Sequence, residues 1–208
     1  MSPTWPELYF IRHGQTDWNF EGRYQGSRDI PLNDIGRGQA DLNGKLLQQL
    51  LTRSDRTPAD FNWYMSPLSR TRETMERIRG AFPSTLPAVT PDARLIEISF
   101  GIYEGRLHTE LAAGEMAIAG ERDAAFWDFR PPSGESYADV ASRIVAFGRE
   151  LRGPSIIVAH GGILRVLRRL IEDFPEERAV NWFPPQDSVI HFIDGKSVVY
   201  PAGQSWDD

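Results

Sequence analysis

The sequence predicts a layered α/β domain with a mainly parallel sheet. Strand-like and helix-like patterns alternate through most of the 208 residues, which is typical of this fold class. Two units share one form, a short apolar strand followed by histidine and glycine, and they begin at Leu8 and Ser155. A chain of this length can bury a core of its own.

The first half of the chain predicts two strands and two helices. Residues 8–11 are apolar and aromatic, so we expect a buried strand that opens into a long loop. Asn33 is the expected N-cap of the first helix, and Ser66-Pro67 the expected start of the second, after a strand at 61–65. Apolar residues recur in them at helical spacing, namely Ile35, Leu42, Leu46 and Leu50 in the first and Thr71, Met75, Ile78 and Phe82 in the second.

The second half begins with an expected short strand at 95–98. Residues 106–134 are irregular, and we interpret them as an insertion that covers one face of a single domain spanning 1–208. A helix is predicted from Tyr137 to Leu151, a β-branched strand at 155–159 and a helix at 163–171. Residues 189–200 predict a closing hairpin around Asp194-Gly195-Lys196.

Composition excludes several classes of function. The chain has no cysteine, so it has no disulfide, thiolate metal site or cysteine nucleophile. A net charge of −6 without a block of Lys or Arg argues against a nucleic-acid partner. No apolar run approaches the roughly 20 residues of a membrane span, and the amino terminus lacks a basic-then-apolar leader. We therefore expect a cytoplasmic protein without a membrane partner, either a monomer or a homodimer.

Two of the four histidines share one context. His13 and His160 each follow an apolar strand and precede glycine, and ligands bind at the carboxyl ends of parallel strands. The alternative is that each is a structural histidine at a strand end. His108 is expected at the surface or near substrate, and His191 is expected to be structural because it lies in mid-strand.

Residues around these histidines have the chemistry that a phosphoryl group requires. Arg12, Thr16 and Asn19 supply a cation and neutral polar groups within RHGQTDWN. Arg70 lies in the first turn of a predicted helix, where an anion is favoured, although a solvent-exposed helix face is the alternative for it.

Glu97 is the preferred proton carrier. It lies between apolar residues in RLIEISFGIYEGR, and burial makes a carboxyl group a usable general acid near neutral pH. Glu104 has less apolar surroundings, so we expect it to orient a loop or accept from backbone amides.

The ordered motifs RHGQTDWN, SPLSRTRET, LIEISFGIYEG and AHGG resemble the histidine phosphatase superfamily, also called the phosphoglycerate mutase-like family, over about residues 8–194. The resemblance implies a three-layer α/β/α sandwich. It implies His13 as the phosphorylated histidine, Glu97 as the acid and base, and His160 as a second histidine of the site. The phosphate-binding residues that we expect are Arg12, Asn19, Arg70, Thr16, Gln25 and Gly26.

The implied activity is hydrolysis of a small phosphorylated metabolite through phosphohistidine, without a metal or other cofactor. Three alternatives stay open: a phosphoglycerate mutase-type transfer, a non-catalytic phospholigand-binding protein, and a metallohydrolase built from His13, His160, Asp17 and Glu97. Few cations in 105–134 (Arg106, Arg122 and Arg130) and a short acidic tail favour the phosphatase. The sequence does not identify the substrate. Nearby candidates for recognising it are Trp18, Tyr24, Phe100, Tyr103, Trp127 and Phe129, with the cations Arg23, Arg28 and Arg106.

Overall fold

Six strands form one central sheet in the order β3-β2-β4-β1-β5-β6. The computed structural model describes residues 3–83, 85–110 and 126–204. The strands are β1 (Leu8–Arg12), β2 (Asn62–Met65), β3 (Val89–Pro91), β4 (Ser155–Ala159), β5 (Ser188–Ile193) and β6 (Lys196–Pro201). The first four pair in parallel, whereas β5 and β6 join as an antiparallel hairpin. The predicted mainly parallel sheet is confirmed, and so is the closing hairpin.

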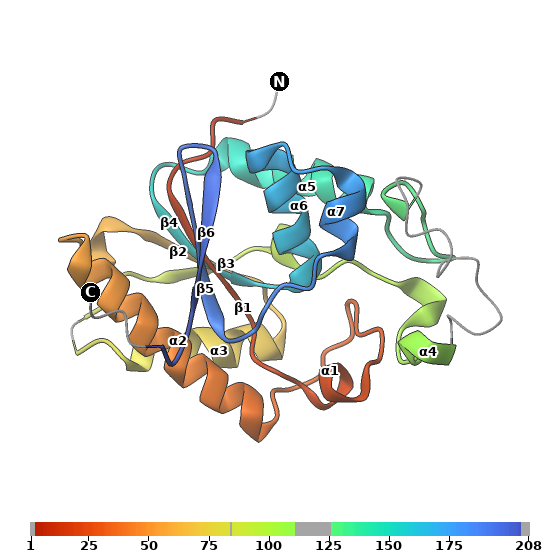
Figure 1. Ribbon diagram of the computed structural model, residues 1–208, viewed down its shortest axis with the longest axis horizontal. Coiled ribbons are helices and arrows are strands. Elements are labelled where there is room, and N and C mark those ends of the chain that lie inside the picture. The colour runs from red at the N-terminus through yellow and green to blue at the C-terminus, as the bar shows by residue number, and fades with distance from the viewer. Residues whose placement is uncertain (1–2, 84, 111–125, 205–208) are drawn as a thin grey trace.

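Helices cover both faces of the sheet, which gives the expected three layers (Figure 1). One face carries α2 (Asp34–Arg53) and α3 (Ser69–Gly80), and the other carries α5 (Tyr137–Glu150), α6 (Gly161–Glu172) and α7 (Glu176–Asn181). Two short helices, α1 (Asp17–Glu21) and α4 (His108–Glu110), lie in the loops beyond β1 and η3 (Gly101–Tyr103).

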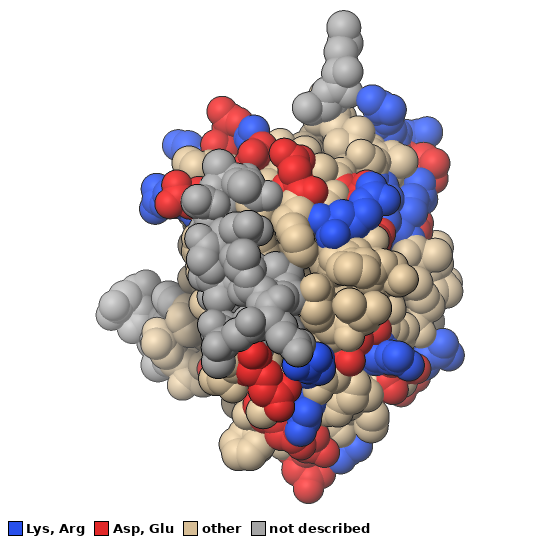
Figure 2. Space-filling view, turned by 90° about the vertical axis from the view of Figure 1, so that its right-hand side faces the viewer, with Lys and Arg blue, Asp and Glu red and all other residues tan. Residues whose placement is uncertain are grey.

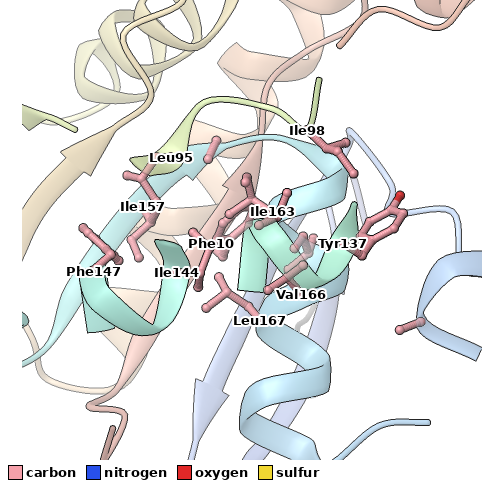
Figure 3. Close-up of a cluster of buried hydrophobic side chains, with 14 of the residues drawn as sticks. Phe10, Leu95, Ile98, Tyr137, Ile144, Phe147, Ile157, Ile163, Val166 and Leu167 are labelled. Atoms are coloured by element: carbon pink, nitrogen blue, oxygen red, sulfur yellow. The ribbon is translucent and has the colours of Figure 1, made fainter. Parts of the chain in front are cut away.

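The alternation of β1 side chains divides the core into two clusters. Leu8 and Phe10 pack against the α5 and α6 side, together with Ile144, Ile157 and others shown in Figure 3. Tyr9 and Ile11 belong to the cluster beneath α2 and α3. Both faces of β1 are therefore buried, and the strand is held rigidly on either side.

The register of β1 and β4 brings the two histidines together. Arg12 pairs with Ala159 across the two strands, and the amide of His13 donates to the carbonyl of Ala159 at 3.0 Å. His13 and His160 thus leave adjacent strands at the same edge of the sheet. This is the edge at which parallel sheets bind ligands.

The predicted strand at 95–98 is wrong. The chain forms a 3-10 turn, η2 (Ala93–Leu95), followed by an irregular segment, and the edge position beside β2 is taken by β3. Leu95 and Ile98 are both buried although they are three residues apart. The spacing therefore reflects a turn that packs two apolar side chains, rather than the two-residue repeat of a strand.

The apolar face of α2 also differs from the expectation. Asn33 does cap this helix, since its side chain accepts from the amide of Gly36. Ile35 and Leu42, however, are 57% and 43% exposed, and the buried leucines lie at positions 46, 47, 50 and 51. Only the leucines in the second half of α2 are buried against the sheet.

Four of the described α-helices and strands were not predicted, and each is six residues or shorter: α1, β3, α4 and α7. The helix after β2 begins at Ser69 with Leu68 as its N-cap, two residues later than expected. Most of the expected insertion at 106–134 falls on 111–125, which lie outside the described residues. No helix in the described ranges is long and apolar enough to cross a membrane.

Candidate active site

His13 is buried and held in one orientation. It is 2% exposed, and its Nδ1 lies 2.7 Å from the carbonyl oxygen of Gly14. A carbonyl only accepts, so Nδ1 carries the ring proton and Nε2 of the neutral ring keeps its lone pair. Burial, followed by the charges of Arg70 and Arg12, lowers the pKa of His13 well below 6.5. His13 is therefore unprotonated on Nε2 at neutral pH, which is the state that a histidine nucleophile requires.

Two guanidinium groups lie close enough to His13 to act on it. Arg12 donates to the carbonyl of Pro184 at 2.6 Å. Arg70, fully buried, donates to the carbonyls of Arg28 (2.6 Å) and Gly26 (2.9 Å). Burial lowers the pKa of each arginine to about 10, so both stay charged at neutral pH. Neither is a solvent-exposed cation, which excludes the surface alternative for Arg70.

His160 stands beside this group. Its ring centroid is 5.1 Å from that of His13, and its Nε2 lies 2.7 Å from the hydroxyl of Ser66. Burial, and then the charge of Arg70, lowers the pKa of His160 well below 6.5. His160 is thus neutral, and its Nδ1 has no hydrogen-bond partner among the described residues.

Unpartnered buried atoms concentrate at this place. Six buried side-chain nitrogen or oxygen atoms among the described residues lack a hydrogen bond, and three of them are Nε of Arg12, Nε of Arg70 and Nδ1 of His160. Leaving a buried polar group unpaired costs about 1–3 kcal/mol. Nε of Arg12 and Nε of Arg70 are therefore two donors without an acceptor. Nδ1 of His160 is a third donor in the tautomer whose Nε2 accepts from the Ser66 hydroxyl, and a phosphoryl group carries three peripheral oxygens that can accept from such donors.

The loop after His13 supplies the neutral part of the site. Thr16 caps α1 and donates through its hydroxyl to the side-chain oxygen of Gln25. A pocket opens beside Arg12 and His13, and Asn19, Gln25 and Gly26 also line it. The carbonyl of Gly26 accepts from Arg70. Thr16 is fully buried and positions its neighbours instead of lining the pocket.

Glu97 lines the same pocket and is held by two backbone amides. Its Oε1 accepts from the amides of Ile98 and Gly162, both at 3.0 Å. A Cβ on Gly162 would lie 2.4 Å from that oxygen, so glycine is required for the carboxylate to reach the start of α6. Glu104 instead accepts from Ser27 and Phe100 and pairs with Arg28. It orients two loops, as the sequence predicted for it.

Arg165 and Gln186 were not singled out from the sequence. Arg165 lines the pocket and donates to the hydroxyl of Tyr137 and the carbonyl of Trp182, each at 2.7 Å. The sequence feature that could have identified Arg165 is its position five residues after His160, in the first turns of α6. Gln186 precedes β5 and offered no local signal, because its side-chain and backbone hydrogen bonds are with residues more than 140 positions away.

Gln186 sets the orientation of the Asn19 amide. Its Nε2 donates to Oδ1 of Asn19 (3.0 Å) and to the carbonyl of His13 (3.2 Å). The amide of Thr16 donates to the same Oδ1 at 3.2 Å. With Oδ1 occupied twice, Nδ2 of Asn19 remains as a donor for a ligand oxygen.

We expect Gln186→Leu to weaken inhibition by inorganic phosphate and to lower kcat/KM by about tenfold, the effect of one misplaced hydrogen bond. Steady-state kinetics with phosphate as inhibitor measures both. Gln49→Leu, at an exposed position of α2, is the matched control. Equal phosphate inhibition in Gln186→Leu and the unaltered protein would contradict the orienting role.

Stability should fall on acidification, because both site histidines have lowered pKa values. Below pH ~6.5 the unfolded chain binds protons at these positions while the folded chain does not. As the pH falls below ~6.5, each histidine lowers the free energy of unfolding by up to about 1.4 kcal/mol per pH unit. Above that pH, its stabilising contribution is fully present. Urea unfolding between pH 7.5 and 5 should show a shallower decline for His13→Asn. An equal decline of the free energy of unfolding in His13→Asn and the unaltered protein would refute the lowered pKa of His13.

The remaining candidates lie elsewhere or have other partners. His191 pairs with Glu7 at 2.9 Å and stacks on Tyr9, so its predicted structural role is confirmed. His108 lines the pocket. Asp17 is exposed and accepts from Asn33, away from the histidines. In the described ranges, no three His, Asp or Glu side chains are grouped to hold a metal ion.

Of the six aromatic residues proposed to recognise substrate, Tyr24 and Phe100 line the pocket. Trp127, Phe129 and Tyr103 pack with the core beneath α5 and α6 instead. The ring of Trp18 packs against Gly105. Arg122 lies outside the described residues.

Comparison with known proteins agrees with this geometry. The chain is 33% identical over 193 residues to glucosyl-3-phosphoglycerate phosphatase of Mycolicibacterium vanbaalenii, covering 84% of this chain and 76% of that protein. It is 30% identical over 185 residues to 2,3-bisphosphoglycerate-dependent phosphoglycerate mutase of Allorhizobium ampelinum, covering 84% and 83%. The structure of mycobacterial glucosyl-3-phosphoglycerate phosphatase complexed with VO3 superposes with a TM-score of 0.73 at 25% identity, covering 96% of this chain and 100% of that one.

The family profile described as "Histidine phosphatase superfamily (branch 1)" matches residues 8–198. That range runs from the first residue of β1 into β6 and includes every predicted site residue. With the strand–histidine–glycine units, the two arginines beside His13 and the three-layer fold in place, this chain belongs to the histidine phosphatase superfamily.

Proposed function

We propose that this chain is a phosphomonoester hydrolase that forms phosphohistidine on Nε2 of His13. The unpartnered donors of Arg12, Arg70 and His160 around a neutral His13 carry the proposal. A phosphoryl dianion would satisfy all three and relieve the repulsion between the two guanidinium groups.

The first step transfers the phosphoryl group to the enzyme. Nε2 of His13 forms a bond to phosphorus as the ester P–O bond breaks, while Arg12, Arg70, Asn19 and His160 bind the three peripheral oxygens. Protonated Glu97 gives its proton to the departing alkoxide. Oε1 of Glu97 accepts from the amides of Ile98 and Gly162, and Oε2 accepts from Gly162 at 3.2 Å, so the carboxyl group is held in place in the pocket that it lines.

The second step regenerates the enzyme. Glu97, now ionised, takes a proton from water as the water oxygen bonds to phosphorus and the N–P bond breaks. Inorganic phosphate leaves and His13 returns to its neutral form. The arginines supply the positive charge that the transition state needs, so the proposal includes no metal.

Hydrolysis is proposed ahead of mutase transfer, because a phosphoglycerate mutase must also bind a carboxylate. Two of the cations offered for this by the segment after Glu104 are already paired, Arg106 with Glu110 at 3.6 Å and Arg130 with Asp139. The mutase remains the second candidate because relatives such as the Allorhizobium protein have that name.

Release of free phosphate from a phosphate ester tests the proposal directly. We expect stoichiometric phosphate and alcohol, a phosphoenzyme that is labile to acid, and unchanged turnover after exhaustive chelation. An isomerised ester without phosphate release would establish the mutase instead. Activity lost on chelation and restored by metal would support the metallohydrolase.

A further inference from the structure

The pocket beyond the phosphate-binding residues is built from aromatic rings. Tyr24 contacts Phe100 and His108 edge-on, with ring centroids 4.8 and 4.2 Å apart. Phe126 and Phe183 line the same pocket from other segments of the chain. Phe183 is 66% exposed, and exposure of its apolar ring to water is unfavourable. These rings offer flat apolar surface to the part of a substrate that extends from the phosphoryl group.

Among the described residues, four arginines that could bind a carboxylate on the substrate already have carboxylate partners. Arg23 lines the pocket, but its Nε lies 2.5 Å from Glu21 and its Nη1 donates to the carbonyl of Gly105. Arg28 pairs with Glu104 at 3.3 Å, and Arg106 and Arg130 pair as described above. Figure 2, which faces the side of the molecule where α4 and α7 lie, shows charges of both signs interspersed among uncharged residues.

Besides Arg12 and Arg23, the described lining of the pocket holds one more arginine, Arg165, and its charge acts at the phosphoryl end. It lies close enough to Arg12 to lower the pKa of that residue further. Its guanidinium is fixed by Tyr137 and Trp182 and lies over the ring of Phe183 at 5.6 Å. Arg165 therefore adds to the charge that binds the phosphoryl group and supports one ring of the wall.

We infer that the alcohol released by this enzyme is uncharged and carries a ring, and that a carboxylate on it is disfavoured. This inference rests on the proposed hydrolase activity. A carboxylate beside Tyr24 and Phe100 would lose water, and Arg23, the described arginine that lines this part of the pocket, is already paired with Glu21, so binding a carboxylate there is costly. A ring would instead stack or meet these side chains edge-on, at about 0.5–1.5 kcal/mol per pair.

Three esters separate the contributions of ring and charge. Benzyl phosphate, 4-carboxybenzyl phosphate and ethyl phosphate all release an alcohol of low acidity, so differences in leaving-group chemistry are small. We expect kcat/KM for benzyl phosphate to exceed that for ethyl phosphate and for the carboxylated ester by about tenfold each. Turnover of 4-carboxybenzyl phosphate or ethyl phosphate as fast as benzyl phosphate would overturn the inference.

Three substitutions test which residues cause these substrate preferences. Phe183→Ala should reduce the benzyl-to-ethyl preference, whereas Phe20→Ala, at a 75% exposed phenylalanine outside the pocket, should leave it unchanged. Glu21→Gln removes the partner of Arg23 and should raise kcat/KM for the carboxylated ester about two- to fivefold relative to benzyl phosphate, the usual range for one exposed ion pair. A preference that is the same in Phe183→Ala and Phe20→Ala would contradict the aromatic wall.

Binding distinguishes failure of this inference from failure of the proposed function. Benzylphosphonate and 4-carboxybenzylphosphonate cannot be hydrolysed, and calorimetry should show tighter binding of the uncharged compound. If none of the esters releases phosphate, the proposed hydrolase activity fails while the phosphonates still test the preference. Equal or tighter binding of the carboxylated phosphonate would overturn the inference itself.

Discussion

Replacing His13 with asparagine is expected to abolish phosphoryl transfer, lowering kcat on the order of 10⁴-fold or more, as loss of a covalent nucleophile does. The neutral ring presents the lone pair of Nε2 because Nδ1 donates to Gly14, and asparagine offers no comparable nucleophile. Phosphate release from benzyl phosphate measures the loss. Acid-labile label from a radioactive ester should be absent from the variant.

The fold should survive this substitution, because removing the ring also removes a buried group from beside Arg12 and Arg70. Circular dichroism and thermal unfolding check this point. His191→Asn is the matched control, since His191 lies on β5 with Glu7 as its partner, outside the pocket. A labelled His13→Asn protein, or one with normal turnover, would assign the nucleophile elsewhere.

Replacing Glu97 with glutamine is expected to lower kcat/KM for alkyl phosphates by about 10²–10⁴-fold, the usual contribution of general acid–base catalysis. The amide oxygen of glutamine can still accept from Gly162 and Ile98, so the local structure should remain. Esters with acidic alcohols need less protonation at the leaving oxygen. The loss should therefore be much smaller for 4-nitrophenyl phosphate than for ethyl phosphate.

Glu104→Gln provides the comparison. Glu104 is 5% exposed in its side chain and joins Ser27, Arg28 and Phe100, so we expect this variant to lose stability without a changed dependence on the leaving group. Equal losses for both esters in Glu97→Gln would remove Glu97 from the role of general acid. A selective loss in Glu104→Gln would move that role there.

Local pattern was sufficient for the strands that carry the two histidines. Residues 8–11 and 155–159 are apolar enough to be buried on both faces, and each strand ends at a histidine followed by glycine. Such a pattern depends only on neighbouring residues, as does the Asn33 cap of α2. These predictions held because burial and capping are decided within a few positions along the chain.

The segment around Glu97 shows why other predictions failed. Its apolar neighbours suggested a strand, but Leu95 and Ile98 pack from an irregular chain whose conformation is held by contacts with the start of α6. The prediction for α2 failed at Ile35 and Leu42 for a similar reason. These side chains are exposed, and the part of a helix that is covered depends on how far the sheet beneath it extends. Propensity and periodicity carry no information about such distant partners.

The sequence by itself determined the alternation of strands and helices, the two histidines at strand ends and the inventory of arginines, amides and carboxylates. Only the tertiary structure decided that β1 and β4 are neighbours, which places the rings of His13 and His160 5.1 Å apart. It also added Arg165 and Gln186, and paired Arg28 with Glu104. The physical reason is that charge and hydrogen bonding act over a few ångströms in space, whatever the separation of the residues along the chain.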